Sequence, residues 1–344
     1  MPAPRIAIRD PALSAELVSR APLRFAGGAD EATDRPAHLR AASGLAALGS
    51  MFAVVLDDVN FVALVDPRAP AQARAIALPP GPGGRRQFGD SRATKHLKLD
   101  LEACVATGGD SPMLVAFGSG SSPARESVVV VRDITGATPV AEIVHAPALY
   151  GRLRTASSFA GSELNVEGAL LLGDTLRLFG RGNGAVAGEL RPVNATCDLS
   201  WPGLLAHLRA PREHAAPESS RIRQFLLGEL AGVPLGFTDA TAWGDAILFT
   251  AAAEASPDAT RDGEVHGSAI GIIDARGDVR WTPIVDASGR VVREKAEGLL
   301  VADDARGELW VVADRDDESQ PSELCRIRLR GPWRAGDQEA RSDR

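Results

Sequence analysis

Five oxygen-bearing side chains recur along the chain at similar intervals. They are Ser43, Glu102, Glu167, Thr238 and Glu297, separated by 59, 65, 71 and 59 residues (43→102→167→238→297). A single glutamate at the start of a strand is most often only a solvated surface charge. If the fold brings these positions together, however, three carboxylates meet, and they repel one another unless their pKa values rise or a cation lies between them. The first chemistry to consider is therefore cation binding.

The types of these side chains favour calcium over zinc. Carboxylate and hydroxyl oxygens suit a hard ion, and calcium accepts roughly 6–8 oxygen ligands in tolerant geometry. Zinc is disfavoured because no His or Cys occupies the five positions. Asp239 is a rival of its neighbour Thr238, since aspartate is the better calcium donor. The predicted calcium ligands are Ser43, Glu102, Glu167, Glu297 and either Thr238 or Asp239.

Each of the five positions opens the same short pattern, in which an apolar run, a turn and a second apolar run follow one another. The five stretches are 43–58, 102–121, 167–183, 238–254 and 297–317. A turn residue lies six positions after each start, at Gly49, Gly108, Gly173, Gly244 and Asp303. A further strand-like run follows each hairpin. Units of about 60 residues with three or four strands are typical of β-propeller blades.

The repeats predict an all-β fold with a single β-propeller domain over residues 1–335 and a polar tail over 336–344. Five blades are preferred. The first 42 residues contain RIAI (5–8) and PLRFA (22–26), which are predicted to supply outer strands to the last blade and close the ring. Six blades remain an alternative if residues 137–156 form a degenerate blade. One short helical segment is expected within 201–215.

The loops that follow the second run of each hairpin should meet at the end of the propeller where the five positions lie. They carry candidate bases (Asp58 and Asp314, with Asp316 as a further choice) and two arginines, Arg125 and Arg181. A guanidinium binds phosphate or carboxylate oxygens bidentately. The alternative is that acidic turns only keep the surface soluble. The predicted catalytic residues are Asp58, Asp314 and Arg181, and the predicted substrate-binding residues are Lys98, Ser119, Arg125, Asn183 and Lys295.

Lysine is rare and clustered in this chain. Of 38 basic residues only Lys95, Lys98 and Lys295 are lysines, and each lies within seven residues before Glu102 or Glu297. A compact ammonium beside a metal site suits an anionic substrate. The alternative is that Lys98 merely neutralises Asp100 or Glu102. His96 is the one histidine to consider as an acid or base, although a structural role is the more common one for such a residue.

Composition and missing motifs exclude several classes of protein. A net charge of −7 and a pI near 5.5 argue against nucleic acid or an anionic membrane as partner. Three scattered cysteines form neither a disulfide framework nor a CxxC metal site. GxSxG and P-loop motifs are absent. No apolar run reaches 18 residues and the first residues do not read as a secretory signal, so a cytoplasmic protein is expected.

The repeat starts resemble those of the calcium-activated nucleotidases, the soluble apyrases. The segments concerned are SGLAALGSMFAVVLDD, DLEACV, VEGALLLGDTLRLF, GFTDATAW and KAEGLL. The resemblance covers the blade cores, about a third of the chain. It implies a five-bladed propeller with one central calcium ion, held by Ser and Glu residues at the start of the innermost strands. Some of these segments are also similar to phytase-like and esterase-like propellers of bacteria.

Two functions follow from these observations. The first is calcium-dependent hydrolysis of a small anionic substrate, a phosphate ester or anhydride, in which loss of Arg181 lowers turnover far more than stability. The second is a propeller without catalytic activity, whose calcium is structural and whose mouth binds a ligand or a protein partner.

Overall fold

The computed structural model describes residues 3–261 and 263–334, so the expected tail over 336–344 lies outside the described residues. Twenty of the strands form five four-stranded antiparallel sheets. The first holds β3 (Ala42–Leu48), β4 (Met51–Leu56), β5 (Phe61–Val65) and β6 (Arg74–Ala77). The second holds β7 (Leu101–Thr107), β8 (Met113–Gly118), β9 (Ser127–Arg132) and β10 (Val140–His145). The third holds β11 (Val166–Leu172), β12 (Thr175–Gly180), β13 (Asn194–Ser200) and β14 (Ser220–Leu226).

The last two sheets involve both ends of the chain. The fourth holds β16 (Val233–Trp243), β17 (Ala246–Glu254), β18 (Val265–Ile273) and β19 (Val279–Val285), and the short β15 (Glu229–Leu230) pairs with β16. The fifth holds β20 (Lys295–Asp303), β21 (Glu308–Asp314), β22 (Glu323–Arg330) and β2 (Ser14–Pro22). The strand of the N-terminal segment therefore completes the sheet that the C-terminal segment begins.

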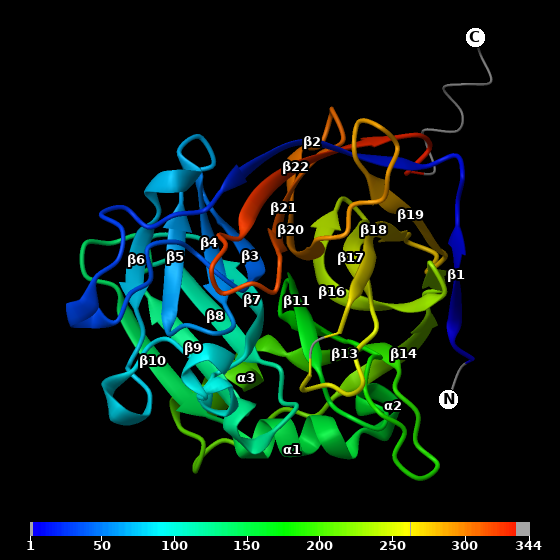
Figure 1. Cartoon of the computed structure of the whole chain (residues 1–344). Coiled ribbons are helices and arrows are strands. Elements are labelled where there is room, and N and C mark those ends of the chain that lie inside the picture. The colour runs from blue at the N-terminus through cyan, green and yellow to red at the C-terminus, as the bar shows by residue number, and fades with distance from the viewer. Residues whose placement is uncertain (1–2, 262, 335–344) are drawn as a thin grey trace.

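The five sheets are arranged around a common centre, as in a propeller. Their first strands contact one another in the cyclic order β3, β7, β11, β16, β20 and back to β3. Figure 1 shows these strands around the middle, with the later strands of each sheet farther out. Each of five buried hydrophobic clusters joins two neighbouring sheets, so the core lies between the sheets all the way round. The architecture is therefore all-β and propeller-like.

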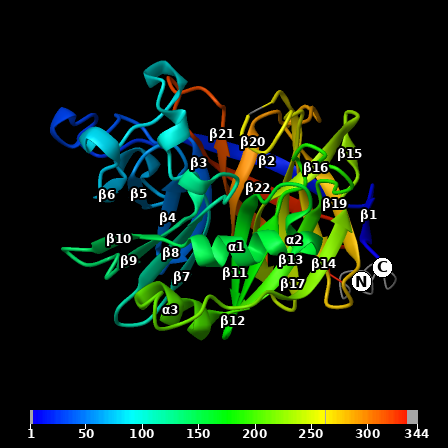
Figure 2. The ribbon, with the colours of Figure 1, turned by 90° about the horizontal axis from the view of Figure 1, so that it is seen from below.

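Helices are few and peripheral. α1 (Pro147–Thr155), α2 (Ser157–Ala160) and α3 (Trp201–Arg209) belong to the cluster between the second and third sheets (Figure 2). The helix expected within 201–215 is α3. Residues 137–156, considered as a sixth blade, instead contain β10 and α1, so they extend the second sheet rather than form a further one. None of the helices in the described ranges is long and apolar enough to cross a membrane.

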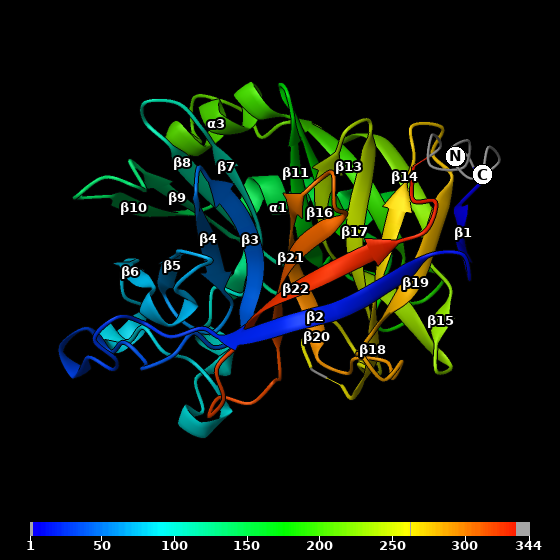
Figure 3. The same cartoon turned by 90° about the horizontal axis from the view of Figure 1, so that it is seen from above.

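The N-terminal strands differ from the sequence expectation. The outer strand of the fifth sheet is β2, which pairs antiparallel with β22 from Ser14 to Pro22 (Figure 3). RIAI instead lies in β1 (Arg5–Arg9), which pairs in parallel with β14 and β19 between the third and fourth sheets. PLRFA forms single bridges to residues 38 and 73 beside the first sheet. Leu13, Ala15 and Leu17 pack into the hydrophobic cluster of the fifth sheet, whereas Ile6 and Ile8 are exposed. The segment of β2, in which apolar and polar residues alternate, therefore joins the fifth sheet, and the more apolar RIAI segment does not.

Deletion of residues 1–30 is expected to destabilise the protein strongly, because it removes β2 and leaves β22, which still pairs with β21, with one unpaired edge along its whole length. Thermal unfolding measures the effect. Deletion of residues 1–10 is the control: it removes β1 but keeps β2, and should lower the melting temperature much less. A 1–30 deletion that melts at the temperature of the full chain would contradict this role of β2.

Candidate functional site

The five repeated positions share one unusual backbone feature, a β-bulge. In β3, β7, β11 and β16 the pairing register skips the predicted position alone, and in β20 it skips Glu297 together with Gly298. In β16 the register passes from Phe237 to Asp239, so the bulged residue is Thr238 and not its neighbour. A bulge turns a side chain out of the regular alternation of the strand. This shared backbone geometry groups Thr238, rather than Asp239, with Ser43 and the three glutamates.

In three of the five first strands the residue after the bulged position is a glycine, which lets neighbouring strands approach closely. These residues are Gly44, Gly168 and Gly298. A Cβ atom on Gly298 would lie 2.5 Å from Cβ of Leu45, and one on Gly168 would lie 3.1 Å from Cα of Asp239. Neighbouring first strands therefore pack backbone against backbone beside the bulges, and the five side chains converge.

The three glutamates meet as the sequence predicts. Carboxylate oxygens of Glu102, Glu167 and Glu297 lie within 4.8 Å of one another, and the three residues are only 7%, 3% and 3% exposed. Among the described residues, Oε2 of Glu167 and Oε2 of Glu297 have no hydrogen-bond partner. Burial raises the pKa of Glu167 and of Glu102, the latter well above its usual value, and raises that of Glu297 to about 8. This glutamate triad is the centre of the candidate site.

The two hydroxyl residues connect neighbouring first strands. Ser43 Oγ donates to the carbonyl of Leu101, and Thr238 Oγ1 donates to the carbonyl of Ala296 at 2.6 Å. Each of these carbonyls belongs to the residue before a glutamate of the triad. Asp239 lies apart from the triad: its Oδ2 accepts from the amide of Leu299 at 2.8 Å, and burial raises its pKa well above the usual value. Whether any of these three residues binds a cation stays a prediction.

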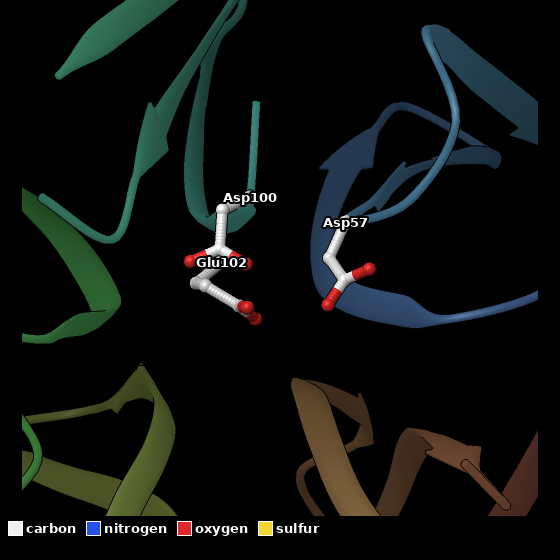
Figure 4. Close-up of side chains that lie close together, drawn as sticks. All are labelled: Asp57, Asp100 and Glu102. Carbon is white, nitrogen blue, oxygen red and sulfur yellow. The ribbon is translucent and has the colours of Figure 1, made fainter. Parts of the chain in front are cut away.

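Lys98 and Arg125 surround a second group of carboxylates next to the triad. Lys98 Nζ lies 2.6 Å from Asp57 Oδ2 and 2.7 Å from Asp100 Oδ1, and Arg125 is 2.9 Å from Asp100 Oδ2. Figure 4 shows Asp57 on one sheet and Asp100 with Glu102 on the next. Burial lowers the pKa of Lys98, but Asp100 and Asp57 outweigh it and hold that pKa well above its usual value. Lys98 therefore stays charged.

Arg181 and Lys295 are held in the same manner on the other side of the triad. Arg181 lies 3.4 Å from Glu167 Oε1 and 2.7 Å from Glu254 Oε2. Lys295 Nζ lies 2.7 Å from Glu297 Oε1 and 3.5 Å from the same Glu254 oxygen. Burial works against the ionised form of Glu254, but Lys295 and Arg181 hold the pKa of this carboxyl well below its usual range. The predicted cationic side chains are thus paired with carboxylates.

Three further predicted residues, Ser119, Asn183 and Asp314, take part in hydrogen bonds. Ser119 donates to Asp100 Oδ2. Asn183 Oδ1 accepts from Asn165, whose Nδ2 also donates to Glu167 Oε1 at 2.7 Å. Both oxygens of Asp314 accept hydrogen bonds, Oδ1 from Ala41 N and Ser322 Oγ, and Oδ2 from Asp316 N.

Asp58 is the predicted catalytic residue with a buried carboxylate oxygen that lacks a partner. Its Oδ2 lies 2.8 Å from Arg40, whereas its Oδ1 has no hydrogen-bond partner among the described residues. Burial and the charge of Asp57 raise the pKa of Asp58 to about 7. A carboxylate with these properties can accept a proton near neutral pH.

Most of the predicted residues line one pocket with about 990 Å³ of space, part of it open to solvent. The lining includes Ser43, Asp58, Lys98, Glu102, Arg125, Glu167, Arg181, Asn183, Lys295, Glu297 and Asp314. Three predicted residues, Ser119, Thr238 and Asp239, are buried and do not line it. Among the described residues, 13 Asp and Glu side chains line the pocket against 7 Lys and Arg, an excess of 13 − 7 = 6 acidic groups. We call this the central pocket.

The structure adds three partners of the predicted residues that were not among the predicted site residues, namely Arg40, Asn165 and Glu254. A signal for Asn165 was present in the repeats. It stands two residues before Glu167, as Asp100 stands before Glu102 and Lys295 before Glu297, and all three bind a carboxylate or a cation at the triad.

The fold and the triad together define a propeller-like protein with a candidate cation centre at the middle of its sheets. The chain belongs to a family of unknown function (DUF6929), whose model matches residues 38–329. No curated protein matches the chain in sequence.

Several solved structures are similar to the chain at low identity. Myxococcus xanthus glutaminyl cyclase has 12% identity and a TM-score of 0.44, with 96% of this chain and 99% of that chain covered. The Neurospora crassa Pan2 WD40 domain has 8% identity and a TM-score of 0.39, covering 94% and 97%. The GH93 α-L-arabinofuranosidase of Fusarium graminearum has 8% identity and a TM-score of 0.39, covering 91% and 98%.

Proposed function

We propose that this chain is a five-bladed β-propeller that binds one calcium ion at the glutamate triad and hydrolyses a small anionic substrate, a phosphate ester or anhydride, in the central pocket. The blade count is supported by the five four-stranded sheets with first strands in cyclic contact and by β2, which completes the fifth sheet. The observation that carries the metal assignment is the triad itself, with two buried oxygens that lack any partner.

The residues present fit calcium. Three carboxylates within 4.8 Å of one another supply hard oxygen ligands, and Ser43 adds a hydroxyl oxygen at the wall of the same pocket. Unsatisfied carboxylate oxygens buried this deeply are costly unless a proton or a cation binds them. Calcium bound there would polarise a phosphoryl oxygen or lower the pKa of a water molecule. All three glutamates of the triad line the central pocket, part of which is open to solvent.

The charge balance of the pocket explains why an anionic substrate needs the metal. The described lining has six more acidic than basic side chains, so even with raised pKa values at Asp58 and at the glutamate triad it offers an anion no excess of positive charge. Arg181, Lys98 and Lys295 carry positive charge, yet each is already within 2.7 Å of a carboxylate oxygen. A bound divalent ion would supply the positive charge that meets the substrate, while the basic side chains orient the ligating carboxylates.

Asp58 is the residue that we propose as the general base. It lines the central pocket, and its buried Oδ1 has no hydrogen-bond partner among the described residues, whereas both oxygens of Asp314 accept hydrogen bonds. Arg40 fixes the other Asp58 oxygen at 2.8 Å and so sets the direction of Oδ1. In this role Asp58 accepts the proton of the attacking water.

Asp58→Asn is expected to lower turnover by roughly 10²–10⁴-fold, the usual contribution of a general base, and also to lower the melting temperature because it weakens the ion pair with the buried Arg40. Asp314→Asn is the control from the same pocket. Because it disturbs the hydrogen bonds to Ala41 and Ser322, it should lower the melting temperature more than the turnover. The assignment is wrong if Asp58→Asn retains the turnover of the unaltered enzyme.

The experiment that tests the proposed function is a screen of purified protein with and without calcium against phosphate esters, nucleotides and lactones. Hydrolysis of a phosphate substrate that requires calcium is the expected result. Activity that survives a chelator, or bound calcium together with no hydrolysis of any of these substrates, would contradict the catalytic part of the proposal.

A second candidate function is supported by the ion pairs themselves. Because Lys98, Arg125, Arg181 and Lys295 all have carboxylate partners, the site also has the character of a cross-linked structural centre. In that case calcium would tie the five sheets together, and the pocket would bind a ligand or a protein partner without catalysis. Calcium binding together with an inactive screen would favour this second function.

A further inference from the structure

All three lysines of this chain line the central pocket. Only three of the 38 basic residues are lysines, whereas arginine serves everywhere else. The two side chains differ physically: guanidinium is a planar fork with five donors, and ammonium is a compact point charge. An ammonium group can therefore occupy a position surrounded by oxygens, as a metal ion does, and a guanidinium cannot.

Lys98 lies in such a position. Carboxylate oxygens of Asp57, Asp100 and Glu102 are within 4.8 Å of one another, an arrangement able to hold a metal ion. Lys98 Nζ lies 2.6 Å from the Asp57 oxygen and 2.7 Å from an Asp100 oxygen. These distances are close to the roughly 2.3–2.6 Å of a calcium–oxygen bond. The ammonium thus binds two of the three carboxylates of this group at short distance, while Glu102 lies beyond 4.0 Å of it.

Glu102 connects this group to the triad. It is a member of both groups of carboxylates and is more than nine-tenths buried. Among the described residues it has neither a hydrogen bond nor an ion pair within 4.0 Å, although its neighbours Asp100 and Glu167 both have them. A buried carboxylate without a partner between two cation positions has the placement of a bridging ligand.

We infer that the Lys98 ammonium occupies the second position of a two-cation centre, in which Glu102 belongs to both groups of carboxylates and would bridge two metal ions if a metal replaced the ammonium. This inference rests on the proposed calcium site for the first position only. It changes the role of Lys98 from a substrate ligand to a resident cation, fixed by Asp57 and Asp100. It also has a direct consequence: without the ammonium, the three carboxylates around it become a second metal site.

The test is the number of calcium ions bound per chain, measured by titration calorimetry and by elemental analysis after gel filtration. The unaltered protein should bind one ion, and Lys98→Met, which keeps most of the apolar stem, should bind one more. Lys95→Met is the control: it removes another lysine of the same pocket, outside both carboxylate groups, and should leave the number at one. Calcium should also raise the melting temperature of Lys98→Met more than that of the unaltered protein.

A double variant, Asp57→Asn/Lys98→Met, keeps the test decisive if Lys98→Met alone folds poorly. It removes one charge of each sign and one of the three ligands, so it should fold without calcium and bind no additional ion. Lys98→Met that binds the same number of ions as the unaltered protein overturns the inference. So does Lys98→Met that stays unfolded in millimolar calcium while the double variant folds.

The same measurement separates this inference from the proposed function. If the unaltered protein binds no calcium and Lys98→Met binds one ion, the triad site is wrong and the position of Lys98 is supported. If the unaltered protein binds one ion and Lys98→Met also binds one, the triad site stands and the role of Lys98 as a resident cation is refuted.

Discussion

Calcium is expected to raise the melting temperature of the purified protein, and a chelator is expected to reverse the effect. The reason is that calcium binds carboxylates that only the folded chain brings within 4.8 Å of one another. A ligand specific for the folded state stabilises it by about 2.7 kcal/mol at a concentration 100 times its Kd. The effect should be largest near neutral pH and above, because the ion competes with protons for the carboxylates.

Glu102→Gln sharpens this prediction, since it removes a buried charge that has no hydrogen-bond or ion-pair partner within the described ranges. The variant should melt no lower than the unaltered protein in chelator, yet its calcium affinity should fall at least about tenfold, as for loss of a residue that supports a metal. Glu308→Gln is the control: this glutamate is also buried, but it pairs with Arg326 and Arg328 outside the central pocket. Glu102→Gln with an unchanged calcium response would refute the triad as the metal site.

The convergence of the triad was predictable from sequence because it depends on a repeat. The same residue type in the same place of several repeats must meet wherever the repeats close around a centre, and Glu102, Glu167 and Glu297 do. The choice between Thr238 and Asp239 was not predictable in this way. It depends on a shift of one residue in strand pairing, which the bulge between Phe237 and Asp239 makes and which composition does not reveal.

The carboxylate partners of the basic side chains could not be predicted from the sequence, for a related reason. Arg181 and Glu254 lie on different sheets and 73 residues apart, and their contact depends on where two loops end. The N-terminal strands illustrate a different difficulty. An apolar run such as RIAI looks like a core strand, yet only Ala7 of β1 is buried, whereas the more polar SAELVSRAP supplies the outer strand of the fifth sheet.

Arg181→Met is expected to destabilise the calcium-free protein by about 3–5 kcal/mol, the usual effect of removing one partner of a buried ion pair. The guanidinium is 3% exposed and lies between Glu167 and Glu254, so its loss leaves two buried carboxylates without their shared cation. This expectation reverses the one drawn from sequence, in which Arg181 acts on turnover far more than on stability. Chemical denaturation with and without calcium measures it.

Arg177→Met is the control, from strand β12, which ends one residue before Arg181. Its guanidinium binds the buried Asp198 with two short contacts of 2.7 and 2.8 Å outside the central pocket, so its loss should also destabilise the protein, but without any link to calcium. Calcium should recover part of the stability lost in Arg181→Met, because the ion neutralises Glu167, and should recover nothing in Arg177→Met. If calcium rescues neither variant, then Arg181 does not serve as the counter-charge of the triad, and a direct role in binding substrate becomes the better explanation for its position.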